Sequence, residues 1–503
     1  SGVQLYLHTA RRVRPGYDPS AEDLAHVVEI CRLVQGMPLA LLLAASWTDA
    51  LSPAQIAAHM AHDLDFLEGE VRDLPPRQRS MRAVFDASWR LLAEGEQQAF
   101  AALSVFRGGL TAQAAEQVAE VDVRTLRALL QRSFLQLDAD GRYDVHELLR
   151  QYGEEKLNTS VDGGHEVRDR HCNYYAGLAQ GWHPPVGAQT PQMAAGMQTE
   201  IDNVRAAWSW AVEQAYPEAL ARLSAIVAGL CDQFQLWQEG EAAFRRAAER
   251  ISALVPAPSQ PPMLITSTLA GLVMQQGHFS TILGHLGTAT GLLAQSQALL
   301  ERLACTDQDV RAQRAQLSYY MGERAFWQDM VAARPWFEES LALSRELDPI
   351  EGPAGLCLGI IAYFQGDYRE ATQRLVETRR LSHESGNIML DQSALSCLAK
   401  VAVARGDLGT AERLAVELWG PSWDQDEGDR EFEETWDRGE FLAGLGRYAE
   451  AAPPLETMVT GCRERGSDIF LLRFLERQTW VEMHLGQYGR ALAVTKETQH
   501  VAR

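Results

Sequence analysis

Lysine is nearly absent from this chain of 503 residues, where it occurs only at Lys156, Lys400 and Lys496. A P-loop that cradles nucleotide phosphates needs a lysine directly after a glycine, so that its amine reaches the β- and γ-phosphates. None of the three lysines follows a glycine. The chain by itself therefore has no recognisable NTPase phosphate site, and we expect no cofactor to be bound by it alone.

Positive charge is also scarce, because 46 basic residues face 67 acidic ones and leave a net charge of −21. Phosphate affinity depends on clustered positive charge, so nucleic acid is not expected as a partner of the chain as a whole. Long hydrophobic runs are missing too, since no segment reaches the roughly 18 consecutive apolar residues of a membrane span. The seven cysteines are scattered singly, which is typical of reduced core thiols in a cytoplasmic protein.

Catalytic constellations are lacking as well. We find no nucleophile with its base, and His59 and His62 have helical spacing without a third ligand nearby. The sequence therefore predicts no metal site and no catalytic site, and we do not expect this chain to be an enzyme.

What the chain does contain is a 40-residue repeat, marked by glycines at Gly366, Gly406, Gly446 and Gly486. An alanine stands five residues after each glycine, at Ala371, Ala411, Ala451 and Ala491. This pattern predicts helix pairs in which glycine ends the first helix and alanine lies where two helices approach closely. It resembles tetratricopeptide-like repeats, which stack into an α-solenoid with a binding surface. We assign the solenoid to residues 219–503.

An apolar helical pattern near the N-terminus is interrupted by Gly36 and Pro38. The surrounding residues 30–41, Ile-Cys-Arg-Leu-Val-Gln-Gly-Met-Pro-Leu-Ala-Leu, resemble the Gly-Leu-Pro-Leu-Ala segment of bacterial signal-transducing NTPases of the STAND class, the NB-ARC type. The likeness continues through 73–82. It implies a helical adaptor over 1–75, in which Gly36 and Pro38 contact nucleotide, because the proline of this segment lies against the adenine in that family.

Residues 76–157 are predicted to form a small winged-helix domain. Helical patterns lead into strand, turn and strand over 134–145, where Gly141 permits the turn of a short hairpin that would be the wing. The Val-His-Glu at 145–147 then resembles the family's Met-His-Asp motif, whose histidine donates to the β-phosphate of ADP. That resemblance implies the same role for His146. The alternative is a histidine that only caps its own helix.

Winged helices often bind DNA, and the helical pattern over 122–132 carries Arg124, Arg127 and Arg132. Acidic residues crowd around this segment, and phosphate contacts would have to outweigh them. We do not expect DNA as a partner.

An acidic segment between two repeats carries Trp419, Trp423 and Trp436. Aromatic residues beside like charges are prone to interactions, so these three are candidates for a partner surface. The alternative is a solvated loop with aromatic anchors.

The fold predicted is mainly all-α: a helical adaptor, a winged helix, a linker and helical connector over 158–218, and the solenoid. The resemblance implies the sensor portion of a STAND signalling ATPase whose P-loop domain lies outside this chain. The complete protein would bind ADP or ATP, and the partners would be a protein or small-molecule ligand on the solenoid, its own nucleotide-binding domain, and further copies on activation. A stand-alone repeat scaffold, or a winged-helix transcriptional regulator without nucleotide dependence, remains the alternative.

Overall fold

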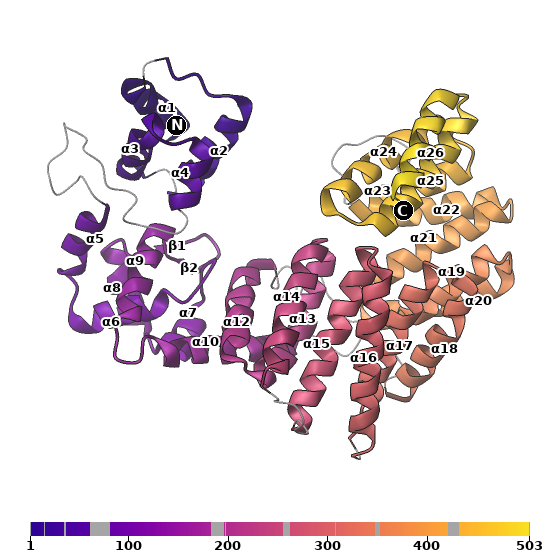
Figure 1. Ribbon diagram of the computed structural model, residues 1–503, viewed down its shortest axis with the longest axis horizontal. Coiled ribbons are helices and arrows are strands. Elements are labelled where there is room, and N and C mark those ends of the chain that lie inside the picture. The colour runs from indigo at the N-terminus through magenta and orange to yellow at the C-terminus, as the bar shows by residue number, and fades with distance from the viewer. Residues whose placement is uncertain are drawn as a thin grey trace. The chain divides into compact units, whose positions relative to one another are not determined.

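The computed structural model describes residues 2–14, 16–34, 37–60, 81–182, 196, 198–254, 262–306, 308–347, 353–420 and 432–501 (Figure 1). Its contacts divide the chain into two compact units. Unit 1 comprises residues 1–175 and 200–210, and unit 2 comprises residues 176–199 and 211–503. This division falls at other positions than the four predicted domain ranges, which stay predictions.

Unit 1 is built from short helices and one hairpin. Its elements are α1 (Gly2–Val13), α2 (Ala21–Leu33), α3 (Pro38–Ser46), the 3₁₀ turn η1 (Trp47–Asp49), α4 (Pro53–Met60), α5 (Met81–Trp89), α6 (Glu94–Leu103), α7 (Ala112–Ala119), α8 (Val123–Gln131), β1 (Gln136–Leu137), β2 (Tyr143–Asp144) and α9 (Glu147–Asn158). Helices α10 (His165–Trp182) and α12 (Ile201–Gln214) each run from one unit into the other.

Local caps explain where several of these helices begin. The hydroxyl of Ser20 accepts from the backbone N–H of Asp23 at 3.0 Å, and the Asp23 carboxylate accepts from the N–H of Ser20 at 3.1 Å. This capping box fixes the start of α2. Asp122 accepts from the N–H of Thr125 at 2.8 Å and starts α8 in the same way.

The predicted hairpin is present and shorter than its sequence pattern. Strands β1 and β2 are antiparallel, with Gln136 opposite Asp144 and Leu137 opposite Tyr143. Gly141 between them has φ +80°, a left-handed conformation that favours glycine. These are the only strands among the residues that the structure describes.

Unit 2 is a succession of antiparallel helix pairs. They are α13 (Pro217–Gln233), α14 (Trp237–Ser252), α15 (Met263–Ile282), α16 (Leu286–Ala304), α17 (Arg311–Phe326), α18 (Met330–Leu347), α19 (Ala354–Phe364), α20 (Tyr368–Ser385), α21 (Ile388–Ala404), α22 (Leu408–Trp419), α23 (Phe432–Gly444), α24 (Tyr448–Arg465), α25 (Asp468–His484) and α26 (Tyr488–Val501). The described chain is therefore mainly α-helical, with tetratricopeptide-like helix pairs, which confirms the predicted fold class.

In four helix pairs, the first helix ends in the same type of turn. Gly366, Gly406, Gly446 and Gly486 have φ of +78°, +74°, +77° and +73°. At the first of these turns, the N–H of Gly366 donates to Tyr363 O at 3.0 Å and the N–H of Asp367 donates to Ala362 O at 2.9 Å. The other three turns repeat this pair of hydrogen bonds. It is a Schellman motif, which satisfies the last carbonyls of each first helix.

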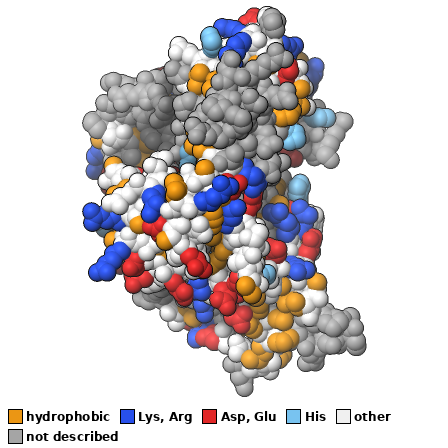
Figure 2. All heavy atoms as spheres, turned by 90° about the vertical axis from the view of Figure 1, so that its left-hand side faces the viewer, with side chains coloured by type: hydrophobic (Ala, Val, Ile, Leu, Met, Phe, Trp, Pro, Cys, Tyr) orange, Lys and Arg blue, Asp and Glu red, His pale blue; other side chains and the backbone are white. Residues whose placement is uncertain are grey.

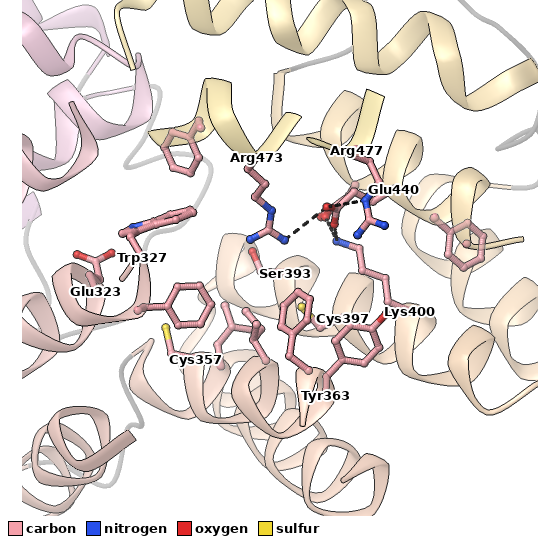
Figure 3. Close-up of a pocket in the computed structure, with 18 of the residues that line it drawn as sticks. Glu323, Trp327, Cys357, Tyr363, Ser393, Cys397, Lys400, Glu440, Arg473 and Arg477 are labelled. Atoms are coloured by element: carbon pink, nitrogen blue, oxygen red, sulfur yellow. Dashed lines mark hydrogen bonds and ion pairs between the residues drawn. The ribbon is translucent and has the colours of Figure 1, made fainter. Parts of the chain in front are cut away.

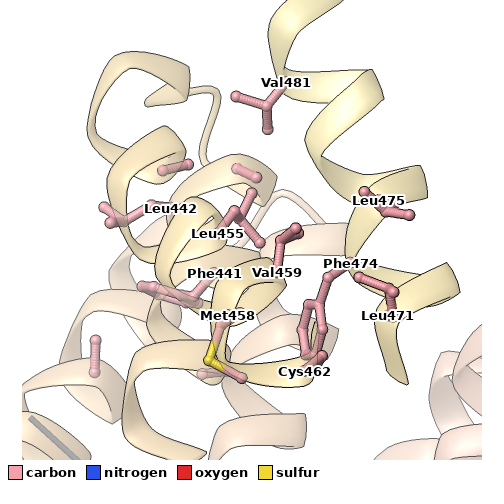
Figure 4. Packing of buried hydrophobic residues seen from close by; sticks show 14 of the residues in the cluster. Phe441, Leu442, Leu455, Met458, Val459, Cys462, Leu471, Phe474, Leu475 and Val481 are labelled. Atoms are coloured by element: carbon pink, nitrogen blue, oxygen red, sulfur yellow. The ribbon is translucent and has the colours of Figure 1, made fainter. Parts of the chain in front are cut away.

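The alanines of the repeat lie between packed helices. Ala371, Ala411 and Ala451 are fully buried and Ala491 is nearly so. The last repeats share a core cluster, whose larger members are Phe441, Leu442, Leu455, Met458, Leu471, Phe474, Leu475 and Val481 (Figure 4). Burial of these side chains holds neighbouring pairs together, at about 1.5–3 kcal/mol for each large apolar residue.

Unit 2 also contacts itself over a long stretch of chain. The Ser467 hydroxyl, at the N-cap of α25, donates to the carbonyl of Ile282 at the end of α15 at 2.7 Å. Beside this bond the ring of Phe470 lies between Trp237 and Trp327, with ring centroids 5.6 and 5.4 Å away. The start of α25 therefore packs against the first repeats of the same unit.

No helix in the described part of the chain is long and apolar enough to cross a membrane.

Candidate functional site: a pocket inside the repeats

A pocket of about 410 Å³ lies within unit 2, lined mainly by the first helices of successive pairs, α17, α19, α21, α23 and α25 (Figure 3). Glu323 and Trp327 are on one side of it, Lys400, Glu440 and Arg477 are on the other, and Arg473 points between them. The lining is thus charged at two ends and apolar in the middle.

The lining follows the 40-residue register of the sequence. One set of equivalent positions consists of Cys357, Cys397, Asp437 and Arg477, and a second of Ile360, Lys400 and Glu440. Because equivalent positions of stacked repeats face the same way, each repeat adds its own residue to the pocket wall. The side chains become charged toward the C-terminal end.

A cluster of ion pairs lies at the C-terminal end of the pocket. The ammonium of Lys400 lies 2.6 Å from the Asp437 carboxylate and 3.0 Å from that of Glu440. The guanidinium groups of Arg473 and Arg477 lie farther from Glu440, at 3.4 and 3.8 Å. Lys400 is therefore the principal partner of both carboxylates.

Glu440 and Lys400 are charged near neutral pH. Burial by itself would raise the pKa of Glu440, but Lys400, Arg473 and Arg477 outweigh it and hold the pKa well below its usual range. Burial by itself would lower the pKa of Lys400, and the carboxylates Asp437 and Glu440 outweigh it and raise that pKa. The cluster is thus a set of fixed charges at one end of the pocket.

Apolar side chains remain uncovered inside the pocket. Phe364 is 46% exposed and Met389 is 44% exposed, and both line it together with Trp327 and Phe470. The guanidinium carbon of Arg473 lies 5.9 Å from the centre of the Phe364 ring. An apolar surface next to a cation is suited to a ligand that has both characters.

At the opposite end, the acidic residue Glu323 contacts a buried histidine that lies behind the pocket wall. The Glu323 carboxylate accepts from Nδ1 of His278 at 2.9 Å and from the Tyr319 hydroxyl at 3.0 Å. Nε2 of His278 lies 3.2 Å from Asp232, and its ring stacks on Tyr320 with centroids 4.3 Å apart. A second cavity of about 360 Å³ lies here and shares Glu323 with the first.

In unit 1, His146 links two of the predicted motifs. Its Nδ1 accepts from the N–H of Leu148 at 3.2 Å, which caps α9. Because Nδ1 accepts, Nε2 carries the proton and donates to the carbonyl of Val34 at 2.9 Å. That carbonyl also accepts from the N–H of Met37 at 2.7 Å. His146 is 6% exposed, so its two hydrogen bonds form a buried connection between the start of α9 and the end of α2.

Of the other two predicted nucleotide-contacting residues, Pro38 directly follows Met37, whose N–H donates to the same Val34 carbonyl. Pro38 is the first residue of α3, where the N–H that proline lacks would have no helical partner. Gly36 lies outside the described residues. The structure thus brings His146 to Val34, two residues before Gly36 in the sequence, and the predicted nucleotide contacts stay predictions.

Of the three tryptophans predicted as a partner surface, only Trp419 has a described side chain. It is half-buried at the end of α22, and its ring packs edge-on against Phe441 with centroids 5.4 Å apart. Trp423 and the side chain of Trp436 lie outside the described residues.

Of the three arginines over 122–132, Arg132 is the C-cap of α8 and is engaged within unit 1. It donates to the carbonyl of Leu91 at 2.9 Å and lies 3.4 Å from the Glu96 carboxylate. On the face shown in Figure 2, basic and acidic side chains are interspersed among the described residues and form no continuous basic band. Phosphate binding would require such a band.

Sequence reasoning missed the pocket. Its signal was available, because Lys400 is one of only three lysines and stands in an otherwise apolar helical pattern. Glu440 occupies the equivalent position one repeat later. Comparing equivalent positions across the repeats would have paired these two residues.

Comparison with known proteins gives relatives over part of the chain, and no protein-family model matches it. A Mycobacterium tuberculosis protein named "Putative HTH-type transcriptional regulator" is 36% identical over 235 residues, which is 44% of this chain and 26% of that protein. An uncharacterized M. tuberculosis protein is 32% identical over 169 residues, which is 31% of this chain and 43% of the relative. The chain thus spans less than half the length of either relative.

Among solved structures, a Rap protein complexed with Competence and Sporulation Factor is 12% identical, with a TM-score of 0.50 over 78% of this chain and 98% of that one. A STAND protein with a tetratricopeptide repeat sensor from Pyrococcus horikoshii is also 12% identical, with a TM-score of 0.40 over 99% of this chain and 72% of that one. At such identities, the likeness to the Rap protein concerns the helical-repeat fold alone.

Proposed function

We propose that this chain is the sensor and regulatory part of a cytoplasmic STAND-type signalling ATPase, in which a ligand bound by the repeats relieves inhibition of a nucleotide-binding module. The observation that carries the proposal is the hydrogen bond from His146 to the Val34 carbonyl, because it joins two segments that separately resemble motifs of that class. The phosphate loop and the output domain would lie outside this chain.

In this proposal, Gly36, Pro38 and His146 face ADP in the resting state of the complete protein, where Nε2 of His146 would exchange the Val34 carbonyl for a phosphate oxygen. Binding of ligand to the repeats would favour an open form, which exchanges ADP for ATP and assembles with further copies. The ligand can shift this equilibrium only by its difference in affinity for the two forms. The pocket in unit 2 supports a sensing role because it offers an apolar surface and fixed charges.

The test uses the complete protein encoded by the full reading frame. We expect His146→Ala to lower ADP retention through purification, measured by chromatography of the released nucleotide, and to raise basal output. His26→Ala is the matched control, because His26 is a solvent-accessible histidine of the same unit whose Nδ1 lies 3.0 Å from the carboxylate of the exposed Glu29. Equal ADP retention in wild type and His146→Ala would reject the proposed role.

A second candidate function is transcriptional regulation without nucleotide dependence. It is favoured by the name of the mycobacterial relative, whose remaining length would have room for a separate DNA-binding domain. A complete reading frame that lacks a P-loop would support this candidate and remove the assigned roles of Pro38 and His146.

A further inference from the structure

We propose that the pocket of unit 2 binds a small organic carboxylate with an apolar body, the carboxylate at Arg473 and Arg477 and the body on Phe364 and Met389. This inference rests on the proposed sensor function and deepens it, because it names the site and the chemical class of the ligand. Three observations support it: the charges at one end of the pocket, the exposure of the lining side chains, and the volume of the pocket.

Among the described residues, the charged end of the pocket carries an excess of one positive charge. Three cations, Lys400, Arg473 and Arg477, face two carboxylates, Asp437 and Glu440. The side chains of Arg473 and Arg477 are 23% and 36% exposed, whereas those of Lys400 and Glu440 are 15% and 6% exposed. An entering anion therefore meets the two guanidinium groups first.

Arg473 and Arg477 already contact Glu440, and a second carboxylate would share their guanidinium groups with it. Lys400 holds Glu440 at 3.0 Å, while Arg473 and Arg477 approach it only to 3.4 and 3.8 Å. A guanidinium has five N–H donors in a planar fork that matches a carboxylate with two parallel hydrogen bonds. A ligand carboxylate can thus bind the arginines while Lys400 keeps Glu440 in place.

The ligand class follows from the rest of the lining. Phe364 and Met389 are large apolar residues that line the pocket and are nearly half exposed, so an apolar body in the pocket would pack against them. A cavity of about 410 Å³ is of the size that holds small molecules. A phosphate with two charges fits less well, because Asp437 and Glu440 stand in the same cluster.

The test measures binding to the 503-residue chain, with tryptophan fluorescence and calorimetry as readouts. The probes are 4-phenylbutyrate, its uncharged amide, and the free acid of the tripeptide Leu-Phe-Leu. We expect the phenylbutyrate to bind at least about tenfold more tightly than the amide, since only the acid engages the arginines. If the amide binds equally well, or if neither acid binds up to 10 mM, the proposal is wrong. If the tripeptide acid binds more than tenfold more tightly than phenylbutyrate, the ligand is a peptide C-terminus and the small-molecule assignment is wrong.

Two variants locate the site. Arg473→Gln should abolish the preference for acid over amide, whereas Arg463→Gln should retain it, because Arg463 forms a surface pair with Glu497 on α24 and α26. Circular dichroism checks that each variant is folded, and if Arg473→Gln does not fold, Arg477→Gln takes its place. An unchanged preference in the folded pocket variant overturns the assignment. ADP retention by the complete protein reports on His146 separately, so failure of this inference and failure of the proposed function are distinguishable.

Discussion

His278 and Glu323 form a buried hydrogen bond, with Nδ1 of the imidazole 2.9 Å from the carboxylate oxygen. Asp232 faces the other ring nitrogen at 3.2 Å, so the histidine stands between two acids from two other helices of unit 2. Both ring nitrogens can donate only when the imidazole is protonated. The pair therefore predicts how unit 2 responds to pH.

Unit 2 is expected to lose stability as the pH rises. Burial by itself would lower the pKa of His278, but Asp232 and Glu323 outweigh it and raise the pKa well above 6.5. A raised folded pKa means that the stabilisation is complete below about 6.5 and is lost as the pH rises through the folded pKa. Hydrogen exchange of α15, corrected for intrinsic rates, should show falling protection from pH 6 to pH 9. His278→Gln should be insensitive over this range, and a sensitive variant would contradict the assignment.

Unit 1 is expected to lose stability as the pH falls, because of His171. Burial lowers the pKa of this histidine to about 4. A lowered folded pKa means that the stabilisation is present above about 6.5 and is lost as the pH falls toward 4. Exchange protection of α10 near His171 should fall in that interval, and His171→Phe should remove the dependence. Constant protection of α10 as the pH falls from about 6.5 toward 4 would contradict the assignment to His171.

The repeat turns can be tested with two glycines of one repeat. Gly406 has φ +74° and no atom within 4 Å of an added Cβ, so Gly406→Ala changes only the backbone strain. We expect it to lower the free energy of unfolding by about 1 kcal/mol. Gly409 lies in α22 without positive φ and is equally open, so Gly409→Ala should stabilise by about 0.5–1 kcal/mol. Chemical denaturation of both variants measures the contrast, and equal effects would contradict it.

The ion cluster predicts a large cost for the loss of Lys400. Lys400→Met leaves Asp437 and Glu440 without their nearest cation, and breaking a buried pair costs about 3–5 kcal/mol. We expect about 3 kcal/mol here, because the Asp437 side chain is 28% exposed. Lys400→Arg should cost less because it keeps the charge.

A double-mutant cycle identifies the source of that cost. Lys400→Met combined with Glu440→Gln should be less destabilised than the sum of the single changes, since the second change removes a buried charge that the first left unpaired. Additive effects, measured by urea unfolding, would show that the two groups do not interact.

Much of the fold could be predicted from the sequence because its determinants are local. Glycine every 40 residues marked the helix ends through backbone conformation, and Gly141 marked the hairpin turn for the same reason. The capping box of Ser20 and Asp23 depends on residues three apart. Such features need no knowledge of distant contacts.

The pocket could not be predicted as easily, because it depends on how the repeats stack. Lys400 and Asp437 are 37 residues apart and meet only when α21 lies beside α23. Similarly, His146 could be singled out by its motif, but its bond to Val34 joins residues 112 apart. Their partners follow from tertiary packing, which no local pattern encodes.

The hydrogen bond from Ser467 to Ile282 joins residues 185 apart in a class of fold whose contacts are usually between neighbours. An open array can fray from its ends, one repeat at a time, because each repeat depends only on the next. Here the start of α25 also packs on Trp237 and Trp327, so the late repeats are stabilised by contacts with the early ones. Unit 2 should therefore unfold as one cooperative block, and should fold more slowly than an open array of equal length, since a long loop must close first.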